Sequence, residues 1–349
     1  MNIMVFCGLN ESKVKAKLYP LILSNQIERI YLIRDNKISL PKVSSVYVPQ
    51  AFKSIPILKL IYKFLIGLYL NITKDVKIVL GIYLTPHGIL SLLNGKIFNK
   101  LTVLSLIGTD INKVLPNSAI LKLLLQSYDL LTVTGKQTKS SLHNFGVSDK
   151  KIKILPSVIS MNKFYPTKVF KKYDLIFIGN LTRNKRLDLI LKSISLSQLE
   201  INIAILGEGP LCKSLKLLSK KLGIAHKTHF LGYIDNISDY INQSRALVLA
   251  SESEGMPQCV MEAMACGLPC ILPNINDLRF VARNNFNCLT FKPLDYNDLV
   301  IKIEKLMVDE RLYNKLSSNA RPSVVYEFSI KNGLDIWDSI LSDSKMHFS

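Results

Sequence analysis

Two glutamates flank a point at which a helix is expected to begin. Glu254 directly precedes Gly255 and lies close to Pro257, and Glu262 lies about a turn and a half further along. Pro257 suits the first turn of a helix, and Gly255 lets the backbone turn sharply and approach a ligand closely. The N–H groups of such a helix start attract phosphate, whereas carboxylates accept hydrogen bonds from sugar hydroxyls. The stretch predicts a site for a molecule with a hydroxylated ring on each side of a diphosphate, which describes a nucleotide sugar.

The two glutamates also have a simpler explanation. Glu254 can cap the helix, and Glu262 can be a solvated residue on its surface; both arrangements are common. The residues by themselves do not decide between the explanations.

The surrounding stretch, SESEGMPQCVMEAMACGLPC, resembles the signature of the retaining glycosyltransferase family numbered four, also called group 1, of the bacterial polysaccharide-biosynthesis type. In that signature two glutamates separated by seven residues are followed by Ala-Met-Ala-x-Gly-x-Pro, as they are here. Further landmarks of the family recur in order: Ile154-Leu155-Pro156, Ile178-Gly179-Asn180-Leu181 with Lys185, Leu206-Gly207-Glu208-Gly209-Pro210, and Phe230-Leu231-Gly232-Tyr233-Ile234. The resemblance is strong over about residues 150–310 and weak before them.

The resemblance implies roles for residues around a donor nucleotide sugar, with UDP as the expected nucleotide. Glu254 would contact the transferred sugar, and Glu262 would hold the ribose hydroxyls. The other expected donor contacts, with the base and with the loop before the helix, are Tyr233, Ile234, Gly255, Met256 and Pro257.

The resemblance also implies a cation at the donor diphosphate, namely Lys185. The family usually has an arginine directly after the glycine of its first motif, and this chain has Asn180 there. We expect Arg183 to supply the missing cation, because stabilising the diphosphate is central to the departure of the nucleotide. A solvated helix face is the alternative for Arg183 and Arg186.

The first half of the chain offers fewer motifs. His87-Gly88 and Gly108-Thr109-Asp110 each follow a strand-like run, so both are expected at the carboxyl edge of a sheet. Asp110 is the candidate catalytic residue of this half, in contact with the acceptor or the donor sugar, and a turn or helix cap is its alternative. His87 is a weaker candidate.

The elements that must position these residues alternate between short β-branched runs and helical patterns, which predicts parallel sheets covered by helices. We expect the GT-B fold: an N-terminal acceptor-binding Rossmann-like domain over 1–160, a donor-binding Rossmann-like domain over 161–325, and a central cleft between them. A helix over 326–349 is expected to cross back to the first domain, because Ile330, Leu334, Trp337 and Leu341 form one apolar stripe. The expected strands are Asn2–Phe6, Arg29–Ile33, Ser45–Val48, Val76–Leu80, Thr102–Leu106, Leu130–Val133, Asp174–Ile178, Asn202–Leu206, Thr228–Leu231, Ala246–Leu249 and Pro269–Leu272.

Charge is distributed unevenly along the 349 residues. The formal net charge is +19; residues 1–165 hold 22 Lys and Arg against 7 Asp and Glu, and residues 166–349 hold 23 against 19. Such a field attracts nucleic acid, anionic lipid or phosphorylated substrates, and a general bias toward lysine is the alternative. The apolar window Ile55 to Ile72 is interrupted by Lys59 and Lys63, so we expect it to lie on anionic lipid, with Lys53 and these two lysines facing the membrane, rather than to span it.

Together these features predict a retaining, metal-independent hexosyltransferase that needs no cofactor and acts on a lipid-linked or oligosaccharide acceptor for O-antigen or capsule. The N-terminus lacks the features of a secretory signal, and the six cysteines lack metal-ligand spacing, so we expect a cytoplasmic protein, peripheral on the inner face of the plasma membrane. Two rival hypotheses are a nucleotide-sugar epimerase of similar architecture and a nucleic-acid-binding protein. No nucleic-acid-binding motif is found, so nucleic acid is not an expected partner.

Overall fold

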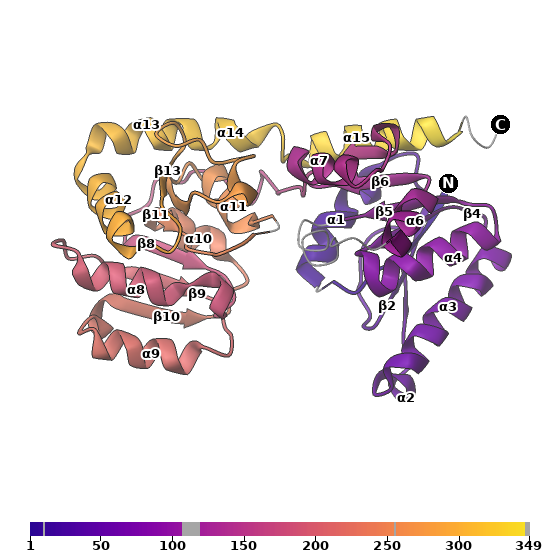
Figure 1. Ribbon diagram of the computed structural model, residues 1–349, viewed down its shortest axis with the longest axis horizontal. Coiled ribbons are helices and arrows are strands. Elements are labelled where there is room, and N and C mark those ends of the chain that lie inside the picture. Colours follow the sequence, from indigo (N-terminus) through magenta and orange to yellow (C-terminus); the bar gives the residue numbers. More distant parts are fainter. Residues whose placement is uncertain (10, 107–118, 255, 346–349) are drawn as a thin grey trace. The chain divides into compact units, whose positions relative to one another are not determined.

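The structure, a computed structural model, describes residues 1–9, 11–106, 119–254 and 256–345. The chain forms two compact units (Figure 1). The first contains Met1–Val158 and Ile330–Ser349, and the second contains Ile159–Ser329. The sequence analysis expected these two boundaries after residues 160 and 325; the structure has them after residues 158 and 329.

The first unit is built on a parallel sheet with the strand order β3-β2-β1-β4-β5-β6-β7. The strands are β1 (Asn2–Phe6), β2 (Arg29–Arg34), β3 (Val43–Tyr47), β4 (Val76–Ile82), β5 (Leu101–Ser105), β6 (Leu130–Val133) and β7 (Ile152–Ile154). Its helices are α1 (Glu11–Leu23), α2 (Gln50–Lys53), α3 (Pro56–Thr73), α4 (Ile89–Ile97), α6 (Ala119–Ser127), α7 (Lys136–Asn144) and α15 (Ile330–Lys345), with short turns at Leu84–Gly88 and Asp149–Lys151.

Alternation along β1 divides the core of this unit between the two faces of the sheet. Ile3 and Val5 pack in one cluster with residues of α1 and α15, whereas Met4 and Phe6 pack in another with residues of α3 and α4. Successive side chains of a strand point to opposite faces, which explains the division. In α15, Trp337 is 2% exposed within the first of these clusters, so the apolar stripe of the last helix packs on the first unit.

The second unit repeats the same topology, with the parallel strand order β10-β9-β8-β11-β12-β13. The strands are β8 (Tyr173–Ile178), β9 (Ile203–Leu206), β10 (Thr228–Gly232), β11 (Ser244–Val248), β12 (Cys270–Pro273) and β13 (Cys288–Phe291). The helices are α8 (Leu187–Leu196), α9 (Cys212–Lys221), α10 (Ile237–Asn242), α11 (Gln258–Ala265), α12 (Tyr296–Val308), α13 (Glu310–Ala320) and α14 (Pro322–Val325), with short turns at Arg183–Lys185, Ala225–Lys227 and Asn276–Leu278.

Both units are therefore Rossmann-like, as predicted. Every strand expected from the sequence is present, with ends displaced by at most two residues. The short strands β7 and β13 were not predicted. Each lies at the edge of its sheet and has only three or four residues.

Helix α3 is long and apolar enough to cross a membrane by length and composition. It packs on α4, where Gly67 lies so close to Asn94 that an added Cβ would be 2.5 Å from the Asn94 Oδ1 atom. The expectation that three lysines face the membrane is wrong for Lys63, which is 2% exposed and pairs with Asp35 at 2.5 Å. Apolar side chains, not that lysine, cover the exposed face of α3.

Candidate functional site

The candidate site lies at the carboxyl edge of the second sheet, where β8 and β11 are neighbours. The chain leaves β8 toward β9 on one side and leaves β11 toward β12 on the other. Open parallel sheets bind ligands at such a reversal of strand order, because the two connections separate there. The loops that follow β8 and β11 carry Lys185 and Glu254.

Lys185 and Glu254 form an ion pair across this position. The Lys185 Nζ and Glu254 Oε1 atoms are 2.6 Å apart, and Glu254 is 8% exposed. A carboxylate in so dry a place is stable as an anion only when it is paired. The structure thus brings together two of the residues that the sequence analysis singled out, from loops 69 residues apart.

Asn184 ties the two loops together. Its Nδ2 atom donates to the Ser253 carbonyl at 2.9 Å, and its Oδ1 atom accepts from the Ser253 hydroxyl at 3.0 Å. Its own carbonyl accepts from the N–H of Glu252 at 2.9 Å. These three bonds hold the Lys185 and Glu254 backbones in register.

Two more charged side chains fix the same loops. Arg186 bridges Glu252 at 2.9 Å and Asp188 at 3.0 Å, so it is a structural cation rather than a free ligand for the donor. Asp277, which follows β12, accepts from the N–H of Glu254 at 3.0 Å. Neither Asn184 nor Asp277 was predicted, because their roles depend on how loops distant in sequence meet.

Glycines let the loops after β8 and β9 approach each other. A Cβ atom on Gly207 would lie 2.0 Å from the carbonyl oxygen of Gly179, and one on Gly209 would lie 2.5 Å from that of Leu181. Gly207 also has a φ of +136°, which L side chains rarely adopt. The glycines of the recognised motifs are thus required by backbone contact near the site.

Helix α11 places the second glutamate. It begins at Gln258, so Pro257 directly precedes the helix rather than lying in its first turn. Glu262 is partly buried, and loss of solvation raises its pKa to about 7. At neutral pH this carboxyl is therefore poised between its two protonation states.

Cys259 of α11 is partly exposed and lies between the two glutamates in the sequence. Loss of solvation raises the pKa of its thiol to about 12; the charge of Lys185 lowers this pKa, and those of Glu254 and Glu262 raise it. The arrangement provides an ammonium for a diphosphate and two carboxylates for hydroxyl groups.

The remaining predicted residues lie in other loops of the second unit, next to Glu254, or outside the described residues. Tyr233 follows β10 and is 69% exposed, and Ile234 beside it is partly buried. Arg183 is exposed and lines a cavity of about 360 Å³ beside α9, with Leu211 and Ser214 among its neighbours. The structure gives Arg183 no contact with the Lys185–Glu254 pair within the described residues. Met256 is partly buried, and Asp110 and Gly255 lie outside the described residues.

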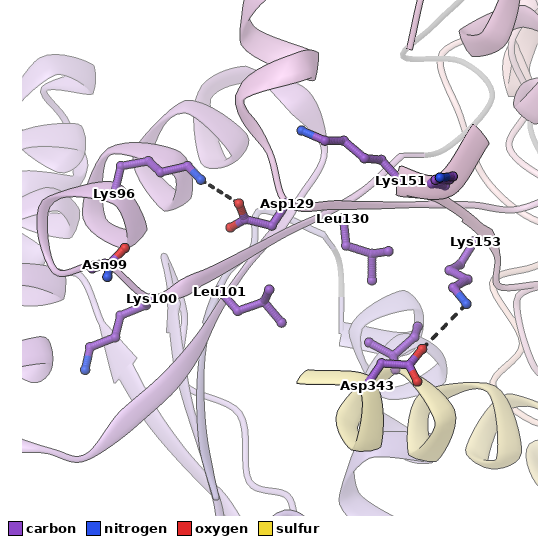
Figure 2. Close-up of a pocket in the computed structure, with 11 residues that line it drawn as sticks. Lys96, Asn99, Lys100, Leu101, Asp129, Leu130, Lys151, Lys153 and Asp343 are labelled. Carbon is purple, nitrogen blue, oxygen red and sulfur yellow. Dashed lines mark hydrogen bonds and ion pairs between the residues drawn. The ribbon is translucent and has the colours of Figure 1, made fainter. Parts of the chain in front are cut away.

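A cavity of about 540 Å³ lies elsewhere, in the first unit (Figure 2). Leu101 and Leu130, the first residues of β5 and β6, line it, so it opens at the amino edge of the first sheet. Its lysines are partly neutralised: Lys96 pairs with Asp129 at 2.7 Å, and Lys153 with Asp343 at 3.7 Å. None of the predicted site residues lines this cavity.

Comparison with known proteins gives the site a context. Residues 162–323 match the family described as glycosyl transferases group 1. The N-acetyl-alpha-D-glucosaminyl L-malate synthase of Bacillus anthracis is 24% identical over 75% of this chain and 73% of its own. The UDP-Gal:alpha-D-GlcNAc-diphosphoundecaprenol alpha-1,3-galactosyltransferase of Escherichia coli is 25% identical over 59% of this chain, and the match spans 58% of that relative's length.

Among solved structures, Anabaena Alr3699/HepE in complex with UDP and glucose is similar over 98% of this chain and 100% of its own. The TM-score is 0.80 at 14% sequence identity. A similarity at this identity concerns the fold, which is the GT-B fold in both.

Proposed function

We propose, from the match of residues 162–323 to the group 1 glycosyl transferases, that this chain is a retaining glycosyltransferase. It transfers a hexosyl or N-acetylhexosaminyl group from a nucleotide-diphosphate sugar, a UDP-sugar by preference, to a lipid-linked saccharide. The product serves a surface polysaccharide such as O-antigen or capsule.

The observation that carries this proposal is the Lys185–Glu254 pair at the strand-order reversal of the second sheet. A bound donor would insert its diphosphate and sugar between these side chains. The ammonium would then turn to the diphosphate, and the carboxylate would accept hydrogen bonds from sugar hydroxyls. Glu262 would accept from the ribose hydroxyls.

The proposed reaction needs little covalent chemistry from the protein. The bond between the anomeric carbon and the diphosphate oxygen breaks, and the acceptor oxygen bonds to the same face of that carbon. The acceptor proton passes to the departing diphosphate, so no metal and no separate base are required. Orientation of the reactants and stabilisation of the diphosphate by Lys185 supply the catalysis.

The proposed substrates rest on similarity together with charge. The E. coli relative is named for a UDP-Gal donor and a diphosphoundecaprenol-linked acceptor, and Alr3699/HepE was solved with UDP and glucose. A lipid-linked acceptor carries negative charge, which suits the surplus of lysine and arginine in residues 1–165.

An enzyme that uses a lipid-linked acceptor works at a membrane, and the proposed membrane-binding surface is the exposed side of α3. Apolar side chains recur along one side of it at helical spacing, all of them largely exposed: Ile57 (65%), Ile61 (48%), Leu65 (55%), Tyr69 (56%) and Ile72 (72%). Such a stripe lies in a lipid surface while basic residues attract anionic headgroups. We propose a cytoplasmic protein that is peripheral on the inner face of the plasma membrane.

Turnover of defined substrates tests the activity. The full-length protein is incubated with a panel of UDP-sugars and a short diphosphate-linked saccharide, and NMR reports the configuration of the new bond. We expect UDP release that depends on the acceptor, a product with the anomeric configuration of the donor, and no loss on adding a chelator. UDP release with no new glycosidic bond, as an epimerase would give, contradicts the proposal.

A further inference from the structure

The end of β1 in the first unit is surrounded by buried positive charge. Arg34, the last residue of β2, is 6% exposed and donates from Nη2 to the Leu9 carbonyl at 2.9 Å. Lys63 of α3 is 2% exposed and lies 2.5 Å from the Asp35 carboxylate. Lys59 shares the same carboxylate at 3.4 Å. The Asp35 carboxylate is therefore shared by two lysines, and the hydrogen bond that Arg34 donates is to an uncharged carbonyl.

His87 positions Lys63 without adding charge. The Lys63 Nζ atom lies 3.1 Å from the His87 Nε2 atom. Burial and the charge of Lys63 lower the pKa of His87 to about 4, so at neutral pH its ring is uncharged and Nε2 accepts. The ring packs against Gly8, where an added Cβ would lie 2.5 Å from Cε1. This contact holds the lysine close to the end of β1.

Lys17 of α1 adds a further cation. Its Nζ atom is buried and has no hydrogen-bond partner within the described part of the chain, and the same holds for the Nε atom of Arg34. Burial lowers the pKa of Lys17 to about 8, so the amine is mostly protonated at pH 7. Burial raises the pKa of the Cys7 thiol, directly after β1, and the charges of Arg34, Lys63 and Lys17 oppose that rise.

Such an excess of buried cations is costly. Removing an ammonium from water without a counter-ion costs several kcal/mol, and buried charges are normally paired or bound to a ligand. Among the described residues, Asp35 is the one carboxylate in an ion pair with this group of cations. Gly8 is exposed and carries no side chain, which leaves the backbone above the cluster accessible. An anion that reached these cations would enter at Gly8.

We infer that Arg34, Lys17 and Lys63 bind a phosphate-bearing group of the acceptor at the end of β1. The inference rests on the proposed function for the identity of that acceptor. A diphosphate ester of a lipid fits best, because it brings more than one negative charge to Arg34 and Lys17, which pair with no carboxylate among the described residues, and to Lys63, which shares Asp35 with Lys59. Helix α3 also presents Lys63 inward and its apolar stripe outward, so one helix would serve both the diphosphate and the lipid surface.

Calorimetry with geranyl diphosphate tests the site. The full-length protein is first saturated with UDP, which occupies the place of the donor diphosphate. We expect Lys17→Met and Arg34→Lys each to weaken geranyl diphosphate binding at least tenfold and to leave UDP affinity unchanged. Lys17→Met should also keep or raise the melting temperature, because it removes a buried ammonium that has no partner.

Lys100→Met and Lys150→Met are the matched controls, since they remove the same charge from the cavity at the opposite edge of the sheet. Neither should change the affinity. Unchanged binding by Lys17→Met would overturn the inference, and so would equal losses in the controls or tighter binding of malate than of geranyl diphosphate. If the protein binds UDP but not geranyl diphosphate, the site at the end of β1 is rejected and the proposed function is not. If it binds geranyl diphosphate but not UDP, the donor site of the proposed function is rejected and the site at the end of β1 is supported.

Discussion

Lys185 and Glu254 form an ion pair in which Nζ and Oε1 are 2.6 Å apart. In the proposed complex Lys185 faces the departing diphosphate. We predict that Lys185→Ala lowers kcat/KM for glycosyl transfer about a hundredfold, on the order of 3 kcal/mol of transition-state stabilisation. Steady-state kinetics with the preferred UDP-sugar measure the effect.

Arg183→Ala is the control for this prediction. Arg183 is exposed and lines the cavity beside α9, so its loss should cost less than that of Lys185. If Lys185→Ala kept full activity and Arg183→Ala lost it, Arg183 and not Lys185 would be the cation that stabilises the diphosphate.

The two glutamates should separate binding from turnover. We predict that Glu262→Ala weakens UDP binding about tenfold, because lost ribose hydrogen bonds to a charged acceptor are worth roughly 1.5 kcal/mol. Glu254→Ala should leave UDP affinity within a few-fold and lower turnover, since the sugar that it contacts is absent from UDP. Calorimetry with UDP and steady-state kinetics on both variants test this. Unchanged UDP affinity and unchanged turnover in both variants would show that neither glutamate contacts the donor.

The raised pKa of Glu262 predicts that the free energy of unfolding depends on pH. Its carboxyl ionises near 4.5 in the unfolded chain and near 7 in the folded one. Between these pH values the folded state holds a proton that the unfolded state has released, so stability falls as pH rises from about 4.5 to about 7. Glu262→Gln should remove roughly 2–3 kcal/mol of this fall in the ligand-free protein. Urea unfolding at pH 5 and pH 7.5 measures it, and an identical fall in both proteins would contradict the shift.

At the scale of elements, the strands could be predicted because each carries its own signal. Runs such as Asn2–Phe6 and Leu130–Val133 are short, mostly apolar and contain β-branched residues, and they form β1 and β6 as expected. The landmarks of the second unit likewise follow predicted strands, so their loops meet at one edge of its sheet. The pairing of Lys185 with Glu254 follows from that topology.

The supporting residues of the site could not be predicted in the same way. Asn184 and Asp277 act through bonds to backbone atoms of the loop after β11. Arg186 adopts a left-handed backbone with a φ of 47° and pairs with two carboxylates, a role that its place in a basic run does not suggest. These contacts depend on loop conformation, for which the sequence has no periodic signal.

Backbone contact between the loops after β8 and β9 gives a prediction at this scale. In Gly207→Ala the new Cβ would meet the Gly179 carbonyl oxygen at 2.0 Å, so the loop that leads to Lys185 must shift. We predict a loss of stability of about 3 kcal/mol or more, together with weaker UDP binding. Thermal unfolding with and without UDP measures both.

Gly223→Ala is the matched comparison. Gly223 has a φ of +73° but no atom within 4 Å of an added Cβ, so only backbone strain of about 1 kcal/mol applies. Equal losses in the two variants would show that strain, and not the contact between loops, explains the role of Gly207.

For the whole molecule, charge and apolar surface both favour the first part of the chain as the membrane-binding part. Residues 1–165 carry 22 basic against 7 acidic side chains, and α3 carries the exposed stripe. Because Lys63 is buried, charge reversal there would break an internal ion pair and would not test contact with lipid. The stripe itself is the better place for a substitution.

We predict that the intact protein co-sediments with vesicles that contain anionic lipid, is released as salt rises, and binds neutral vesicles poorly. A surface potential adds roughly 1 kcal/mol per nearby basic residue and fades within a Debye length. Ile57→Ser, Ile61→Ser and Leu65→Ser, combined in one protein, should abolish most of the binding at moderate salt, because they remove the apolar side chains that enter the lipid.

The matched variant carries Leu217→Ser, Ile301→Ser and Val308→Ser, three side chains of the second unit that are 58%, 58% and 68% exposed. It loses comparable exposed apolar surface from helices that have no such stripe in the proposal, so its binding should remain. Both variants should keep UDP affinity, because none of the six residues lies in the loops that carry Lys185 and Glu254. Equal loss of vesicle binding in the two variants would mean that any exposed apolar residue contributes equally. If the parent protein did not bind anionic vesicles at any salt concentration, the proposed membrane association would be wrong.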